Sequence, residues 1–146
     1  MKKIGVILSN LKQIDQNVFM IDYMNKHSND YNISLFVNQQ EELAHRCLTP
    51  VFYMKDAFLY EGIMVATDLF SAECLIKMPS PEKKYFYNWA LEWTFFDMPD
   101  FERINSIYRG INLLANTEED SKTLSKVWKT PAETLPKFDI LNLLRT

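Results

Sequence analysis

The sequence predicts a three-layer α/β domain of the Rossmann type, with a mainly parallel sheet of about six strands. Short apolar runs of strand length alternate with segments of helix length along the chain, which is the pattern of parallel strands connected by helices. The 146 residues are the usual size of one domain, and 47% hydrophobic with 24% charged residues is an ordinary globular composition. We therefore expect residues 1–146 to form a single Rossmann-like domain.

Four strands and two helices are expected in the first half of the chain. The apolar run of residues 4–8 is the first strand, and Val18, Ile21 and Met24 share one face of the helix that follows it. Thr67 or Asp68 is suited to cap the second helix. The expected strands are residues 4–8, 33–37, 50–54 and 62–66, and the expected helices are residues 15–26 and 67–77.

The second half of the chain continues the alternation. Pro79 and Pro81 end the second helix, and an aromatic strand follows. Thr117 with Asp120 approximates a capping box, and the acidic residues 118–120 suit the positive end of a helix dipole. We therefore interpret them as a helix start rather than as catalytic groups. The expected strands are residues 84–88 and 111–115, and the expected helices are residues 101–108 and 117–129.

Charge and cysteine content restrict the partners and the compartment. The net charge of −3 includes no basic excess, so we expect no nucleic-acid partner. Cys47 and Cys74 are too few for a disulfide framework and indicate a reducing compartment. Residues 4–8 are too short for the apolar part of a signal peptide, and no apolar run approaches the roughly 20 residues of a membrane span. We therefore expect a cytoplasmic protein without a membrane span.

The missing motifs argue against most cofactor enzymes. The only glycines, Gly5, Gly62 and Gly110, cannot form G-x-G-x-x-G or a P-loop, and close approach of backbone to a diphosphate normally needs such glycines. No two aspartates lie two residues apart, so an Asp-x-Asp metal–diphosphate clamp is missing as well. His45 and Cys47 offer two metal ligands, whereas zinc takes three or four. We expect neither a cofactor nor a metal site.

Polar residues follow several of the predicted strands at their carboxyl ends, where open α/β sheets bind ligands. The candidate ligand-binding residues are Ser9, Asn10, Thr67, Asp68, Trp89, Glu92, Trp93, Asn116 and Thr117. Glu92 and Asp68 are the candidates for acid/base catalysis. Tryptophan faces stack on sugar rings, so a carboxylate between Trp89 and Trp93 is typical of a sugar site. Taken alone, however, the residues favour an alternative in which the aromatic strand is buried on both faces and Glu92 caps a nearby element.

Three stretches in order carry a family resemblance: residues 62–71 (GIMVATDLFS), 79–87 (PSPEKKYFY) and 91–92 (LE). Together they resemble the amino-terminal, acceptor-side domain of family 4-type GT-B glycosyltransferases, and the similarity extends over residues 2–140. The Leu-Glu-Trp version is most similar to members carried by large bacterial viruses. Ala90 stands where the family frequently has Asp, so any role of that Asp is in doubt here.

The resemblance implies a GT-B half without a donor site. In that family a second Rossmann domain binds the nucleotide-sugar and supplies a Glu-x₇-Glu pair, but none of the ten glutamates here lies eight residues from another. We therefore expect a glycosyltransferase-like single domain without complete transferase activity alone. It would bind an acceptor-like, sugar-type ligand or work with a partner chain that supplies the donor site.

Two other hypotheses remain open. One is a non-catalytic interaction protein derived from a glycosyltransferase half, which could form a homo-oligomer. Its apolar C-terminal tail, residues 138–146, either packs back on the domain or docks on another copy. The other is a small stand-alone enzyme that uses a crevice at the strand ends, with Glu92 and Asp68 as its acid/base groups.

Overall fold

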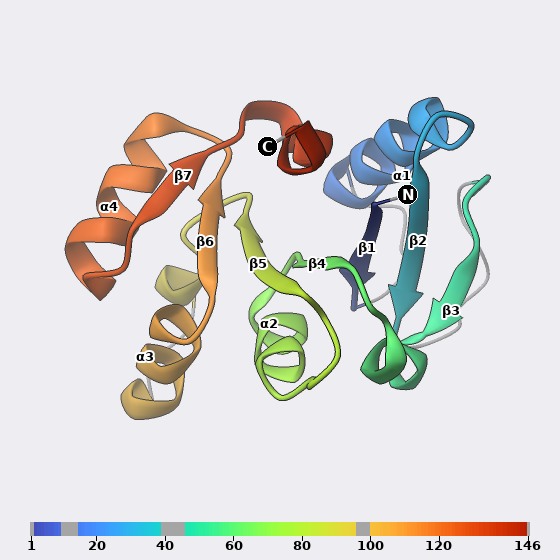
Figure 1. Ribbon diagram of the computed structural model, residues 1–146. Coiled ribbons are helices and arrows are strands. Elements are labelled where there is room, and N and C mark those ends of the chain that lie inside the picture. Colours follow the sequence, from blue (N-terminus) through green and yellow to red (C-terminus); the bar gives the residue numbers. More distant parts are fainter. Residues whose placement is uncertain (1, 10–14, 39–45, 96–99, 146) are drawn as a thin grey trace.

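A seven-stranded, entirely parallel sheet forms the centre of the molecule, with strand order β3-β2-β1-β4-β5-β6-β7 (Figure 1). The computed structural model describes residues 2–9, 15–38, 46–95 and 100–145. The strands are β1 (Lys3–Leu8), β2 (Asn32–Val37), β3 (Val51–Tyr53), β4 (Ile63–Ala66), β5 (Lys83–Asn88), β6 (Asn112–Ala115) and β7 (Ala132–Thr134). The predicted α/β class and the parallel sheet are confirmed, with one strand more than expected.

Within the described residues, four α-helices and four short 3₁₀-helices connect and follow the strands. The α-helices are α1 (Asp15–His27), α2 (Leu69–Ile76), α3 (Phe101–Arg109) and α4 (Glu118–Trp128), and the 3₁₀-helices are η1 (Met54–Leu59), η2 (Glu92–Phe95), η3 (Pro136–Phe138) and η4 (Ile140–Arg145). Asp68 caps α2 and Thr117 caps α4, each by accepting a hydrogen bond from a backbone N–H three residues on. The predicted helices match the observed α-helices to within two residues at each end, because their apolar spacing and caps are local signals.

The central strands of the sheet are buried on both faces, so their alternate residues enter two separate cores. Val6 of β1 points to the face covered by α1, whereas Ile7 points to the face covered by α2, α3 and α4. Figure 1 shows α1 and the C-terminal segment on one side of the sheet and α2 with α3 on the other. This double covering explains why the strands are continuous apolar runs rather than alternating ones.

The C-terminal tail packs back on the domain, on the same face as α1. Phe138, Ile140 and Leu141 are fully buried there. The Tyr87 hydroxyl donates to the Leu135 carbonyl at 2.5 Å and accepts from the Phe138 N–H at 2.9 Å. Of the two alternatives that the sequence leaves open for this segment, the structure therefore shows the first.

Candidate functional site

The strand order reverses between β1 and β4, so the carboxyl ends of these two strands form the topological switch point of the sheet. The Ser9 hydroxyl, just after β1, donates a hydrogen bond to the Asp68 carboxylate, just after β4. The Thr67 hydroxyl donates to the Ile7 carbonyl at 2.7 Å. Three of the predicted site residues, Ser9, Thr67 and Asp68, thus meet above the point where open α/β sheets bind their ligands.

Asp68 is the N-cap of α2 and so stabilises the start of this helix. Its Oδ1 accepts from the Ser71 N–H at 2.7 Å, and Ser71 Oγ accepts from the Asp68 N–H at 3.1 Å, which completes a capping box at α2. Its Oδ2 accepts from Ser9. Since both carboxylate oxygens are engaged and a negative charge is stabilised at a helix N-terminus, Asp68 is an anchor of the site.

Glu92, the first residue of η2, lies against the same helix end. Its two carboxylate oxygens accept from the Leu69 N–H at 3.1 and 3.3 Å. Burial raises the pKa of the Glu92 carboxyl to about 7, helped by the negative charge of Asp68 and opposed by the Leu69 N–H. The structure therefore brings the two predicted acid/base candidates together. At neutral pH Glu92 can both take up and release a proton.

Tyr108, near the end of α3, belongs to this group although the sequence did not single it out as a site residue. Its side chain is fully buried. Burial, and then the charge on Glu92, raise the pKa of its hydroxyl, while the backbone N–H of Trp93 opposes the increase. The Tyr108 oxygen has no hydrogen bond of normal geometry within the described part of the chain, which is uncommon for a buried hydroxyl. A close approach of α3 to the η2 loop is a long-range contact that no local pattern indicates.

The two tryptophans beside Glu92 do not form a pair of exposed sugar-stacking faces. Trp93 is 8% exposed and packs edge-on against the rings of Tyr108 and Trp128 in the core under α2, α3 and α4. Trp89 is partly buried on the other face, where its ring stacks on Phe138 with centroids 6.0 Å apart. The hydrogen bond from Leu69 to Glu92 instead agrees with the alternative that Glu92 caps a nearby element.

The predicted residues beyond β6 form a separate cluster. Asn116 Oδ1 accepts from the Lys137 N–H at 2.7 Å and so holds the start of the tail. The Thr117 hydroxyl accepts from the Asp120 N–H at 3.2 Å as the cap of α4. Two other residues considered in the sequence, Asn10 and His45, lie outside the described residues.

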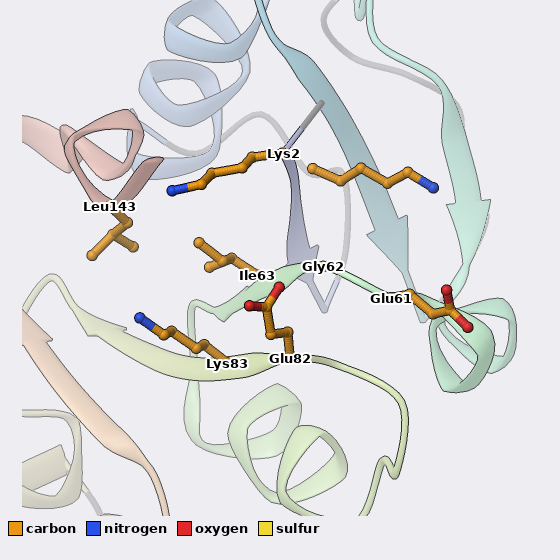
Figure 2. Close-up of a pocket in the computed structure, with 8 residues that line it drawn as sticks. Lys2, Glu61, Gly62, Ile63, Glu82, Lys83 and Leu143 are labelled. Atoms are coloured by element: carbon orange, nitrogen blue, oxygen red, sulfur yellow. The ribbon is translucent and has the colours of Figure 1, made fainter. Parts of the chain in front are cut away.

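A cavity of about 320 Å³ lies at the opposite, amino edge of the sheet. Figure 2 shows Lys2, Lys83 and Glu82 around one space, with Leu143 of η4 on one side. Helices that cross back over a parallel sheet end at this edge, and lysines suit their negative ends. The Lys84 ammonium donates to the Ile76 carbonyl in the last turn of α2 at 3.1 Å. Lys84 does not line this cavity, so helix capping accounts for one lysine of the amino edge and not for those around the cavity. We place the candidate site at the carboxyl edge because the predicted site residues meet there.

Comparisons of the chain with protein-family models, with curated proteins and with solved structures found no match. Within residues 2–9, 15–38, 46–95 and 100–145, no three His, Cys, Asp or Glu side chains are grouped so that they could hold a metal ion. Among the same residues, no helix has the length and apolar character needed to cross a membrane.

Proposed function

We propose that this chain is a glycosyltransferase-like domain that binds a hydroxyl-rich, sugar-type acceptor at the carboxyl edge of its sheet, without complete transferase activity alone. The observation that carries the proposal is the position of Glu92, a partly buried carboxyl with a pKa of about 7 that lies against the N-terminus of α2, the helix that follows the switch-point strand β4. Ionisable groups perturbed by burial and by a specific neighbouring charge are concentrated at functional sites.

The chemistry of Glu92 suits a ligand hydroxyl. An ionised carboxylate offers about four acceptor positions, and within this network Glu92 uses its two oxygens on one N–H, that of Leu69. It therefore retains capacity to accept a hydroxyl hydrogen bond and, near its pKa, to accept the proton itself. Asp68 and Ser9 hold each other and the α2 N-terminus, so they fix the position of the Leu69 N–H against which Glu92 rests.

The proposed lack of complete transferase activity rests on the sequence resemblance. A transferase must hold donor and acceptor together, and the Glu-x₇-Glu pair of the family's donor domain has no counterpart in this sequence. We propose that a partner chain supplies the donor site where transfer takes place. Co-purification of a second chain that binds a nucleotide-sugar would support this part of the proposal.

The experiment is a titration of the isotope-labelled protein with a panel of monosaccharides, lipid-linked sugars and nucleotide-sugars, followed by NMR. A ligand of the proposed class should shift the amide signals of Leu69 and of residues around Glu92. Glu92→Gln should lose the response, because an amide cannot accept a proton and accepts hydroxyl hydrogen bonds less strongly. Glu82→Gln, at the amino edge, is the matched control and should keep it. If no member of the panel perturbs these signals, the proposal fails.

A second candidate function, a non-catalytic interaction protein, is favoured by a different observation. Exposed apolar side chains are concentrated along one edge of the sheet, far from Glu92 in the strand order. Large contiguous apolar patches on a protein surface mark interaction sites. The two functions are compatible, because they use different parts of the molecule.

A further inference from the structure

Six of the ten large hydrophobic side chains that are exposed among the described residues lie within residues 48–59. We call them the β3 edge patch: Leu48, Val51, Phe52, Tyr53, Phe58 and Leu59. Leu59 is 83% exposed, more than any other large hydrophobic side chain in this set. The remaining four, Phe19, Phe70, Phe101 and Val127, are distributed one per α-helix, and single exposed apolar residues of that kind are normal.

The position of the patch is unusual as well as its composition. β3 is an edge strand that pairs with β2 alone, and all three of its residues are exposed. The opposite edge strand, β7, consists of Ala132, Glu133 and Thr134 and carries no exposed large hydrophobic residue. Proteins usually keep sheet edges polar because an apolar edge invites association. One edge of this sheet follows that rule, and the other departs from it.

The patch is presented by a rigid base rather than by a loose loop. The Phe52 ring stacks on Phe36, with centroids 5.6 Å apart, and Met54 and Ala57 of η1 are buried in the core beneath. Met54 and Ala57 hold the first four residues of η1 on the core, and Phe58 and Leu59 at its C-terminal end are exposed. A surface held in place before binding loses little conformational entropy on association, so it favours affinity.

We propose that the β3 edge patch is a dimer interface, in which a second copy of this chain docks edge to edge about a two-fold axis. The six side chains expose on the order of 500 Å² per copy, taking roughly 150–250 Å² for each aromatic side chain and less for each aliphatic one. A standard interface buries about 800 Å² per partner, of which about 65% is apolar in homodimers. An interface that covered all six side chains, those on both faces of the edge strand included, would therefore bury about the apolar area that a homodimer needs.

The charges beside the patch are self-complementary. Lys55 and Asp56 are adjacent, exposed and opposite in sign, and the Lys55 ammonium lies 5.7 Å from the centre of the Tyr53 ring. In a two-fold interface, a contact between residue i and residue j occurs twice, once in each direction. Lys55 of each copy can therefore face Asp56 of the other. A partner protein whose surface carries charge of only one sign could pair with Lys55 or with Asp56, but not with both.

The test is sedimentation equilibrium of the full chain at protein concentrations between about 1 and 100 μM. The wild type is expected to dimerise. Leu59→Glu should raise the dimer dissociation constant at least about 100-fold, since the substitution enters the interface twice. Because Leu59 is exposed, circular dichroism should show an unchanged fold. Val127→Glu, which makes the same change at an exposed site on α4, should leave the dimer intact.

Charge exchange gives the sharper second readout. Lys55→Glu alone should weaken the dimer, because it sets two acidic residues against each other at both contacts, whereas the double variant Lys55→Glu/Asp56→Lys should restore it. A monomeric wild type over the whole concentration range would overturn the proposal. So would a dimer that Leu59→Glu leaves intact, or one that the double variant does not restore. None of these results depends on whether Glu92 binds a sugar.

Discussion

The carboxyl edge of the sheet has two halves, which use similar polar residues with different results. Above β5 and β6, two polar side chains bind the backbone of the tail. The Tyr87 hydroxyl donates to the Leu135 carbonyl and accepts from the Phe138 N–H, and Asn116 Oδ1 accepts from the Lys137 N–H. Next to β4, at the N-terminus of α2, the two carboxylate oxygens of Glu92 share one backbone N–H, that of Leu69. In the first half, above β5 and β6, the tail occupies these polar groups, and we call it the closed half. The second half, around Glu92, retains acceptor capacity, and we call it the open half.

This difference shows why polar residues at strand ends are ambiguous in a sequence. The same residue types cap helices, hold tails or bind ligands, and the first two of these uses occur along one edge here. A binding residue differs from a capping or tail-holding residue in two ways. It retains hydrogen-bonding capacity after the fold has formed, and burial makes its charged form less stable. Glu92 combines spare capacity with a pKa raised to about 7 by burial, and this combination identifies it as the functional candidate.

The largest predicted effect belongs to the closed half. Phe138→Ala should lower the free energy of unfolding by about 3–5 kcal/mol, because it leaves a cavity among Tyr23, Tyr87 and Trp89, whose rings pack on Phe138. Urea denaturation would measure the change.

The matched control for this variant is Phe70→Ala, at an exposed position on α2, which should cost less than about 1 kcal/mol. If Phe138→Ala proved as mild as Phe70→Ala, the tail would not be an integral part of the core, and the contrast between the two halves would be lost.

A smaller effect is predicted for the open half, as a dependence of stability on pH. The Glu92 pKa is about 7 in the folded chain and about 4.5 when unperturbed, so between these values the folded state binds more protons than the unfolded state. Stability should therefore fall as the pH rises from about 4.5 to about 7. The expected contribution of Glu92 is about 1–2 kcal/mol after allowance for its partial exposure to solvent.

The measurement is the free energy of unfolding of the wild type and of Glu92→Gln at several pH values. The difference between the two should change across this range, because glutamine does not titrate. Glu82→Gln removes an exposed carboxylate at the amino edge and should follow the wild type. A constant difference between the wild type and Glu92→Gln would show that the Glu92 pKa is not raised.

The sequence predicts most of the sheet because parallel strands covered on both faces are continuous apolar runs. The exception is β7, whose residues Ala132, Glu133 and Thr134 are short and polar and lie at an edge where one side of the strand has no neighbour. No hydrophobic pattern marks such a strand. It is held by pairing with β6, a contact that becomes visible only in three dimensions.

In the candidate site too, features set by neighbours in sequence could be predicted, whereas features set by contacts between distant segments could not. Asp68 and Thr117 could be predicted as helix caps, since capping depends on neighbours in sequence. The placement of Trp89 and Trp93 on opposite faces could not, because β5 ends at Asn88 and strand alternation does not continue through the turn that follows. Tyr108 of α3 packs against Trp93, next to Glu92 in the chain, and its pKa responds to the charge on Glu92; no sequence signal marks it for that position.

The smallest predicted change in stability provides the most specific test of the open half. Asp68→Asn should change the free energy of unfolding by less than about 0.5 kcal/mol, because Asn caps a helix as well as Asp does. Its Oδ1 can still accept from the Ser71 N–H, and its Nδ2 can donate to the Ser9 hydroxyl oxygen, which reverses the direction of the present bond. It removes the negative charge that helps to raise the Glu92 pKa, so the Glu92 pKa should fall. Carboxyl-carbon NMR of Glu92 would record the titration directly. If the pKa stayed unchanged while the helix cap was preserved, burial alone would set it, and the two carboxyls would not act as a coupled pair.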